Sequence, residues 1–68
     1  MSTFGEILKE LRLEKELSQD SLAKKLYTTQ RRISYLENEK IEPDLFFLKI
    51  CADYFDVSID FLVGRKDY

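Results

Sequence analysis

The stretch from Ser18 to Lys40, SQDSLAKKLYTTQRRISYLENEK, decides how this chain folds. Apolar residues recur in it at intervals of three and four, the period of an amphipathic α-helix, on both sides of Tyr27-Thr28. The spacing predicts a short helix after Ser18, a tight turn at Tyr27-Thr28, and a second helix from residue 30 to about residue 38. The inward positions of the two helices would be Leu22, Ala23, Leu26, Ile33 and Leu36.

The outer side of the second predicted helix carries side chains that bind nucleic acid. At about 100° per residue, the side opposite its apolar positions presents Arg31, Ser34, Tyr35 and Asn38. Arg31 has the donors to bond guanine O6 and N7 as a fork, and Gln30 can bond adenine N6 and N7. This layout indicates a helix-turn-helix, whose second helix lies in the DNA major groove.

Positive charge is concentrated in this unit. The whole chain has 11 Lys and Arg against 13 Asp and Glu, a net charge of −2 at pH 7. Residues 18–40 carry five basic and three acidic side chains, whereas residues 41–68 carry three basic and six acidic ones. Because binding to nucleic acid follows local potential rather than total charge, we expect a salt-sensitive DNA binder that depends on dimerisation for its affinity.

The side-chain inventory argues against other classes of function. A chain of 68 residues provides one small domain with little room for a deep pocket. It has no His and one Cys, so it lacks the usual zinc frameworks and the commonest general base. We expect no enzyme, no metal and no cofactor. Cys51 lies among apolar residues and should be a core residue, with a reactive thiol as the alternative. No apolar run reaches the length of a membrane span, which favours a cytoplasmic protein.

Capping residues place the remaining helices. Thr3 and Glu6 form a capping-box pattern at the start of a first helix. Asp44 caps a fourth helix, in which Leu45, Leu48, Cys51 or Ala52, and Phe55 repeat at core spacing. Ser58 caps a short fifth helix that ends at Gly64, and residues 65–68 form a polar tail. The sequence thus predicts an all-α, compact five-helix domain over residues 1–68, with the helix-turn-helix unit at 18–40.

The order of these landmarks resembles the phage-repressor/Cro (XRE-like) type of helix-turn-helix domain. The resemblance extends from Phe4 to Gly64, and only the joint order of its landmarks is specific. They are Leu17-Ser18-Gln19, Leu22-Ala23, Leu26, Thr28-Thr29-Gln30, Ile33-Ser34, Leu36-Glu37-Asn38, Lys40, Pro43, Ala52, Val57-Ser58, Asp60, Leu62 and Gly64. The resemblance implies a sequence-specific transcriptional regulator, most readily a repressor that binds double-stranded DNA at a pseudo-palindromic operator as a homodimer.

Roles for individual residues follow from the resemblance. The base-reading positions would be Gln30, Arg31, Ser34 and Tyr35. Contacts to the DNA backbone would come from Gln19, Thr28, Thr29, Arg32, Asn38 and Lys40. Arg12 and Glu37 match a buried ion pair that ties the first helix to the end of the third. The alternatives are that Arg31 and Arg32 belong to a solvated face, that Tyr35 packs locally, and that Gln19 is only a first-turn residue.

Two positions depart from the family pattern. Tyr27 and Glu39 stand where such domains usually have Gly, which adopts a positive φ at little cost. A tyrosine at this turn is either strained by about 1–2 kcal/mol or accompanies a turn of different shape. The charge of Glu39 beside Asn38 and Lys40 is also unfavourable for phosphate binding.

An excess of apolar residues predicts an interface. The chain has more large apolar side chains than the inner faces of a small bundle need, and an exposed apolar patch usually marks a contact surface. The expected dimer interface comprises Phe46, Phe47, Ile59, Phe61 and Val63. In this type of domain the last helix pairs two copies, which places their reading helices roughly 34 Å apart. The alternative is that the two phenylalanines flank the monomer core.

A second class of function remains open. The same fold can act as a protein-interaction module, such as an antitoxin or an anti-regulator that binds a protein partner through an acidic surface. The acidic balance of residues 41–68 and the presence of Glu39 favour this alternative. The two functions are compatible, since a protein of this kind can also bind its own operator.

Overall fold

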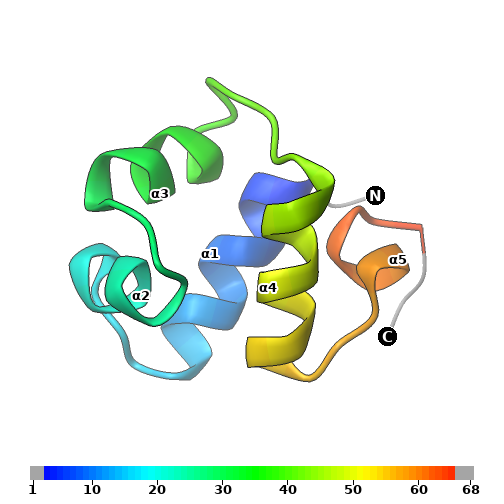
Figure 1. Ribbon diagram of the computed structural model, residues 1–68, viewed down its shortest axis with the longest axis horizontal. Helices are drawn as coiled ribbons and strands as arrows, with labels where there is room; N and C mark the ends of the chain where they lie inside the picture. The colour runs from blue at the N-terminus through cyan, green and yellow to red at the C-terminus, as the bar shows by residue number, and fades with distance from the viewer. Residues whose placement is uncertain (1–2, 66–68) are drawn as a thin grey trace.

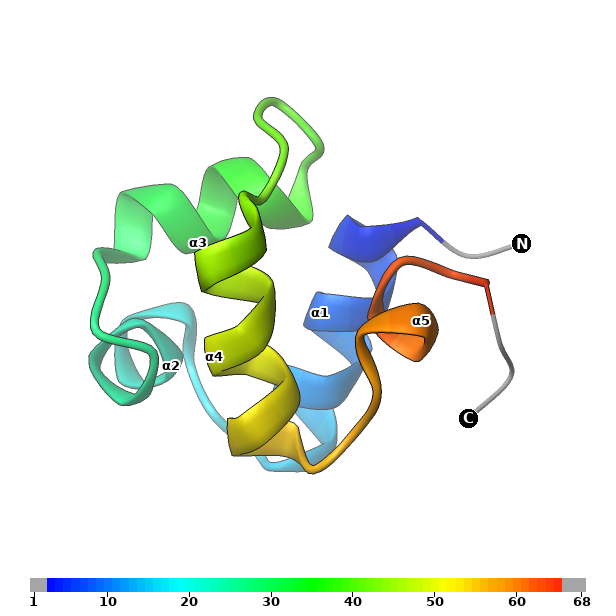
Figure 2. The same ribbon diagram turned by 45° about the vertical axis from the view of Figure 1, so that its right-hand side comes forward.

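Five α-helices account for the regular structure of residues 3–65, the part of the chain that the computed structural model describes. They are α1 (Phe4–Glu14), α2 (Gln19–Lys25), α3 (Gln30–Glu37), α4 (Leu45–Phe55) and α5 (Ile59–Leu62). Helices α2 and α3 lie at one end of the molecule, α5 lies at the other, and α1 and α4 run between them (Figure 1, Figure 2). The predicted all-α, five-helix fold is confirmed.

Each helix begins at a residue whose side chain caps it. The side-chain oxygens of Thr3, Ser18, Thr29, Asp44 and Ser58 accept a hydrogen bond from the backbone N–H three residues later, at 2.7–3.3 Å. Such caps satisfy backbone donors that a helix leaves without a partner. At Thr3 the capping box is complete, because its backbone N–H donates to the carboxylate of Glu6. This bond and that from the Thr3 hydroxyl hold the pKa of Glu6 below its ordinary value.

The helices end in left-handed residues, most of which are not glycine. Glu16, Tyr27, Glu39 and Asp56 have φ between 55° and 60°, and Gly64 has φ of 80°. After α2 and α3, the N–H two residues past the C-cap donates back into the helix, from Thr28 to Ala23 and from Lys40 to Tyr35. This is the Schellman arrangement, which normally uses glycine. The turn at Tyr27 therefore keeps the usual shape, and the tyrosine carries the strain.

All five helices contribute to one core. Its fully buried large side chains are Leu8, Leu22, Leu26, Ile33, Leu36, Phe47, Cys51 and Leu62. The N-terminal turn of α1 lies directly against the end of α3. A side-chain carbon at Gly5 would lie 2.6 Å from the carbonyl oxygen of Leu36 and 2.8 Å from that of Glu37. A glycine is therefore required for α1 to approach the backbone of α3 this closely.

The burial of α4 agrees with the prediction at Leu48, Cys51 and Phe55, which lie in the core, but differs from it in the first turn. Leu45, expected in the core, is 59% exposed, whereas Phe47, expected at the dimer interface, is 2% exposed and packs in the core. Apolar residues lie on almost every side of this helix, so their period does not determine which side faces inward. The guanidinium carbon of Arg32 lies 4.5 Å from the centre of the Phe47 ring and covers it from the α3 side.

No helix among residues 3–65 is both long enough and apolar enough to cross a membrane.

Candidate nucleic-acid interface

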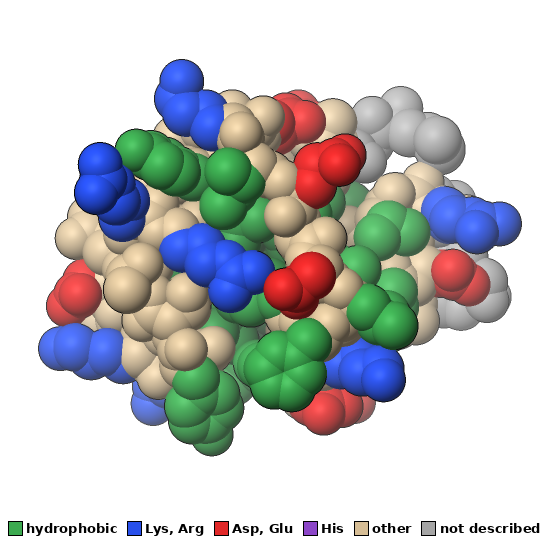
Figure 3. Space-filling view, turned by 45° about the horizontal axis from the view of Figure 1, so that its top comes forward, with side chains coloured by type: hydrophobic (Ala, Val, Ile, Leu, Met, Phe, Trp, Pro, Cys, Tyr) green, Lys and Arg blue, Asp and Glu red, His purple; other side chains and the backbone are tan. Residues whose placement is uncertain are grey.

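The two sides of α3 differ sharply in burial. Ile33 and Leu36 are fully buried on the inner side, whereas Gln30, Arg31 and Tyr35 are exposed on the outer side. The exposure follows from the helical period, because residues at 30, 31 and 35 cannot share the face of 33 and 36. Figure 3, with the α3 end turned forward, shows Lys and Arg side chains projecting around the α2–α3 half of the surface.

Arg31 and Tyr35 are in contact on this outer side. The N–H at Nε of Arg31 donates to the hydroxyl oxygen of Tyr35 at 3.2 Å, and the guanidinium carbon lies 5.6 Å from the ring centre. The two residues are four apart, a spacing at which side chains meet on a helix. Tyr35 thus packs locally and remains at the exposed face, which combines the two alternatives that the sequence left open.

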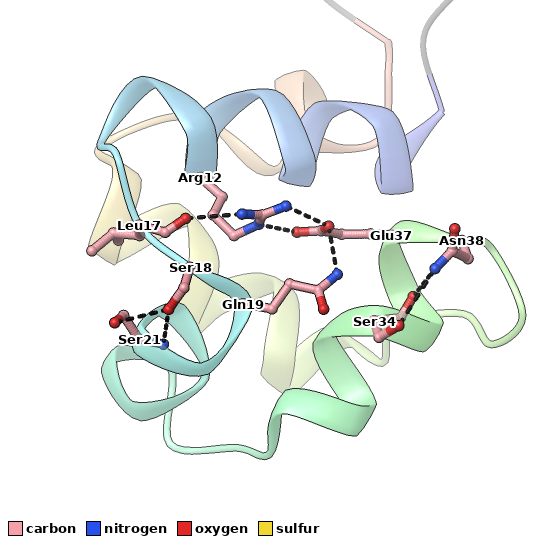
Figure 4. A network of polar contacts seen from close by, with 8 residues as sticks. All are labelled: Arg12, Leu17, Ser18, Gln19, Ser21, Ser34, Glu37 and Asn38. Carbon is pink, nitrogen blue, oxygen red and sulfur yellow. Dashed lines mark hydrogen bonds and ion pairs between the residues drawn. The ribbon is translucent and has the colours of Figure 1, made fainter.

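Ser34 and Asn38 form a second outward pair one turn further along. The side-chain amide of Asn38 donates to the backbone oxygen of Ser34 at 2.9 Å and lies 3.4 Å from its hydroxyl (Figure 4). Asn38 is the C-cap of α3 and is exposed, and Ser34 is half-buried. The amide nitrogen has two hydrogens and both of these bonds use it, so a contact of Asn38 with a phosphate would have to replace the longer bond to the Ser34 hydroxyl.

Arg32 points away from this face. Its guanidinium lies 3.7 Å from the carboxylate of Asp44 and stacks over Phe47, and the residue is half-buried. The expected contact of Arg32 with the DNA backbone is therefore not prepared in this structure, because the charge is already paired with an acidic residue. The sequence pattern does not indicate that Asp44 is the partner of Arg32, because it identifies Asp44 only as a helix cap.

A buried network joins α1, α2 and α3. Arg12 donates from Nε and Nη2 to the two carboxylate oxygens of Glu37, at 2.7 and 3.0 Å, and from Nη1 to the backbone oxygen of Leu17 at 2.8 Å (Figure 4). Both side chains are at least nine-tenths buried. Arg12 and Glu37 thus form the ion pair that the resemblance implied. Removing either partner would leave an uncompensated buried charge, a change that costs roughly 3–5 kcal/mol.

Gln19 belongs to the same network. Its side-chain amide donates to Glu37 at 3.1 Å, so this nitrogen is directed inward rather than toward a phosphate. Gln19 lies at the start of α2, beside the end of α3 (Figure 4). The bond fixes the spacing between the two helices of the unit, a role that the sequence interpretation did not assign.

The remaining expected backbone contacts lie at the ends of α3. Thr29 is exposed and caps the helix through its hydroxyl oxygen, which leaves its O–H free to donate. Thr28 is half-buried in the turn, and Lys40 is exposed just beyond the helix. All three flank the face formed by Gln30, Arg31 and Tyr35.

A family model described as helix-turn-helix matches residues 8–62, most of the chain. The chain belongs to this helix-turn-helix family. The family inferred from the sequence is confirmed.

Individual relatives agree with this assignment. The chain is 38% identical over 64 residues to the HTH-type transcriptional activator BcrR of Enterococcus faecalis, covering 94% of this chain and 31% of that protein. The chain therefore spans about a third of that relative's length. The master regulator for biofilm formation SinR, solved in complex with DNA, is 30% identical, with a TM-score of 0.80 over 88% of this chain and 97% of its own.

A third likeness concerns the fold alone. The P22 c2 repressor, solved in complex with a synthetic operator, has a TM-score of 0.88 at 23% identity, covering 97% of this chain and all of its own. In this helix-turn-helix domain, Gln19, Arg32 and Phe47 make contacts that the sequence interpretation did not anticipate. Each is engaged by a residue from another element, which a helical period does not reveal.

Proposed function

We propose that this helix-turn-helix domain reads duplex DNA by placing α3 in the major groove, as part of a transcription regulator. The observation that carries the proposal is the outer side of α3, where Gln30, Arg31 and Tyr35 stand exposed above a fully buried Ile33 and Leu36. The major groove admits an α-helix and presents a distinct pattern of donors and acceptors for each base pair. A rigid helix with polar side chains on its outer face suits that pattern.

In this proposal, backbone contacts surround the reading helix. Thr28 and Thr29 precede it, and Asn38 and Lys40 follow it, where a hydroxyl, an amide and an ammonium group can donate to phosphates. Such contacts fix the register of the protein on the duplex but carry no base sequence. Gln19 would act indirectly, by holding α2 against α3 through Glu37.

Dimerisation extends the proposal to the whole site. Ile59 and Phe61 are half-buried on α5, and Val63 is 36% exposed just after it, at the end of the molecule opposite α3. Pairing two copies through this surface would bury these side chains and present two reading helices to a pseudo-palindromic operator. The modest excess of positive charge in residues 18–40 favours such avidity.

The test compares a fluorescent duplex from the DNA upstream of the encoding gene with a scrambled duplex, at about 50 and 200 mM salt. We expect tighter binding to the upstream duplex and a footprint over two half-sites about one helical turn apart. Arg31→Ala should weaken this binding by about 1–3 kcal/mol and leave binding to the scrambled duplex nearly unchanged. Arg65→Ala, an exposed arginine beyond α5, is the matched control. Equal binding of both duplexes, unchanged by Arg31→Ala, would contradict the proposal.

A second function is compatible with the first. Leu45 and Phe46 are 59% and 74% exposed beside the acidic residues Glu42 and Asp44. This surface suits a protein partner with a basic, apolar contact face better than it suits DNA. The test uses the protein as bait for a protein partner. If Phe46→Ser no longer retains a partner that the wild type binds, and its affinity for DNA is unchanged, the result would support this function.

A further inference from the structure

We propose that Tyr35 is a positioning residue that holds Arg31 for an end-on contact with guanine, rather than a residue that reads a base of its own. This inference rests on the proposed function, since it assumes that α3 enters the major groove. It makes the pair Arg31–Tyr35, rather than either side chain alone, the element that selects guanine at one position of the operator.

The contact between the two side chains restrains the guanidinium group from two directions. The N–H at Nε donates to the Tyr35 oxygen at 3.2 Å, and the guanidinium carbon lies 5.6 Å from the centre of the same ring. A free arginine side chain on a helix surface samples many rotamers, and a fixed geometry requires it to lose that freedom on binding. Tyr35 removes part of that cost before DNA arrives.

The bond at Nε also selects the way in which Arg31 can bind. A guanidinium has five N–H donors, one on Nε and two on each terminal nitrogen. A side-on fork would use Nε with one terminal nitrogen, whereas an end-on fork uses both terminal nitrogens. Since Nε is already bonded to Tyr35, the end-on pair remains for DNA. Guanine offers the matching pair of acceptors, O6 and N7, whereas adenine offers one acceptor and one donor.

Arg31 is also free of competing charge, unlike its neighbour. Among residues 3–65 Arg31 makes no ion pair, whereas Arg32 lies 3.7 Å from the Asp44 carboxylate and stacks on Phe47. Tyr35 offers an acceptor without a negative charge, so it orients the guanidinium and does not neutralise it. Of these two adjacent arginines, only Arg31 is both oriented and available.

The hydroxyl of Tyr35 is committed by the same bond. Its oxygen accepts from Arg31, so its own proton points away from the guanidinium. Phenylalanine at this position would keep the ring near Arg31 and remove only the acceptor. The substitution Tyr35→Phe therefore tests the hydrogen bond that orients Arg31 while it keeps the contact of the ring. Because Tyr35 is exposed, the substitution should have little effect on the core.

The experiment selects bound sequences from a randomised duplex library at about 50 mM salt and compares base preferences position by position. Wild type should enrich guanine at one position of each half-site. Arg31→Ala should lower that preference by about 5- to 150-fold. Tyr35→Phe should lower it at the same position by about 2- to 10-fold, the worth of one hydrogen bond, and leave other positions unchanged. Tyr27→Phe, which removes an exposed hydroxyl on the side of the molecule where Tyr27 lies near Ile50 and Tyr54, is the matched control and should change nothing.

The outcomes distinguish this inference from the function on which it rests. Enrichment by wild type, with Tyr35→Phe altering a position that Arg31→Ala leaves unchanged, would show that Tyr35 reads its own base and would overturn the inference. The same holds if Tyr35→Phe changes no preference. If wild type enriches no sequence, the proposed function itself fails. The double variant should lose no more guanine preference than Arg31→Ala, and unchanged circular dichroism would show that each variant folds.

Discussion

At the scale of single residues, Cys51 shows how completely the core excludes water. The residue has no exposed surface, and burial raises the pKa of its thiol to about 12, against a smaller opposite effect of the Arg32 charge. The thiolate is the reactive form of cysteine. At neutral pH the side chain is therefore an inert, apolar group, as the sequence suggested.

The raised pKa of Cys51 predicts a pH dependence of stability. The thiol favours folding below its unfolded pKa of about 9, and this contribution is lost as the pH rises toward the folded pKa. Between pH 9 and 11 the free energy of unfolding of wild type should fall more steeply than that of Cys51→Ala, by at most about 1.4 kcal/mol per pH unit. Urea denaturation of both proteins across this range measures the difference. Parallel curves would contradict the expectation, and the common titration of Tyr and Lys cancels in the comparison.

At the scale of elements, the helix ends carry stored strain. Four described helix ends use a non-glycine residue in the left-handed conformation, at Glu16, Tyr27, Glu39 and Asp56. Each costs roughly 1–2 kcal/mol relative to a right-handed conformation. The domain tolerates this cost because the side-chain caps and the common core fix the helices from both ends.

The strain at the α2–α3 turn can be measured. Tyr27 has φ of 60° and is 86% exposed, so its side chain contributes little packing. Tyr27→Gly should be more stable than Tyr27→Ala by about 1 kcal/mol, because both lose the ring but only glycine loses the clash of the Cβ atom. Urea denaturation midpoints at a common slope provide the comparison. Alanine matching glycine would show that the turn is not strained at this residue.

At the scale of the whole molecule, the net charge does not describe how charge is distributed along the chain. Residues 41–68 lower the total charge to −2, while residues 18–40 carry a net positive charge. Association with DNA should then depend on a few phosphate contacts rather than on a general positive field, and each contact has its own dependence on salt.

Lys40 offers a direct test of this arrangement. Lys40→Gln should weaken binding to all duplexes by a similar factor and reduce the slope of log affinity against log salt by about 1 for each copy bound. Lys15→Gln is the control. Lys15 is the C-cap of α1, at the end of that helix away from the α3 terminus, and its ammonium group lies 5.3 Å from the centre of the Tyr54 ring. Fluorescence anisotropy at several salt concentrations gives both slopes. An unchanged slope for Lys40→Gln would exclude Lys40 as a phosphate contact.

Across the molecule, local signals were predictable from the residues, whereas contacts between elements were not, apart from the Arg12–Glu37 pair that the family resemblance implied. The helices, their caps and the inner side of α3 follow from period and capping chemistry, which act within a few residues. The inward residues in the first turn of α4 and the partners of Gln19 and Arg32 depend on residues distant in sequence. The expectation that Phe47 lies at an interface was wrong for this reason, since an apolar period on a helix that is apolar on most sides has no unique solution.

The contact between Arg31 and Tyr35 also bears on how such a domain can change its operator over evolutionary time. Among residues 3–65 the side chain of Gln30 makes no hydrogen bond to Arg31 or Tyr35, so Gln30 can vary by single substitutions that alter one base preference at a time. Arg31 and Tyr35 share a bond, so a change in one alters the effect of the other. Paralogues diverging from this chain should therefore exchange these two positions together, and intermediates that carry only one change should recognise their operators less well than either endpoint.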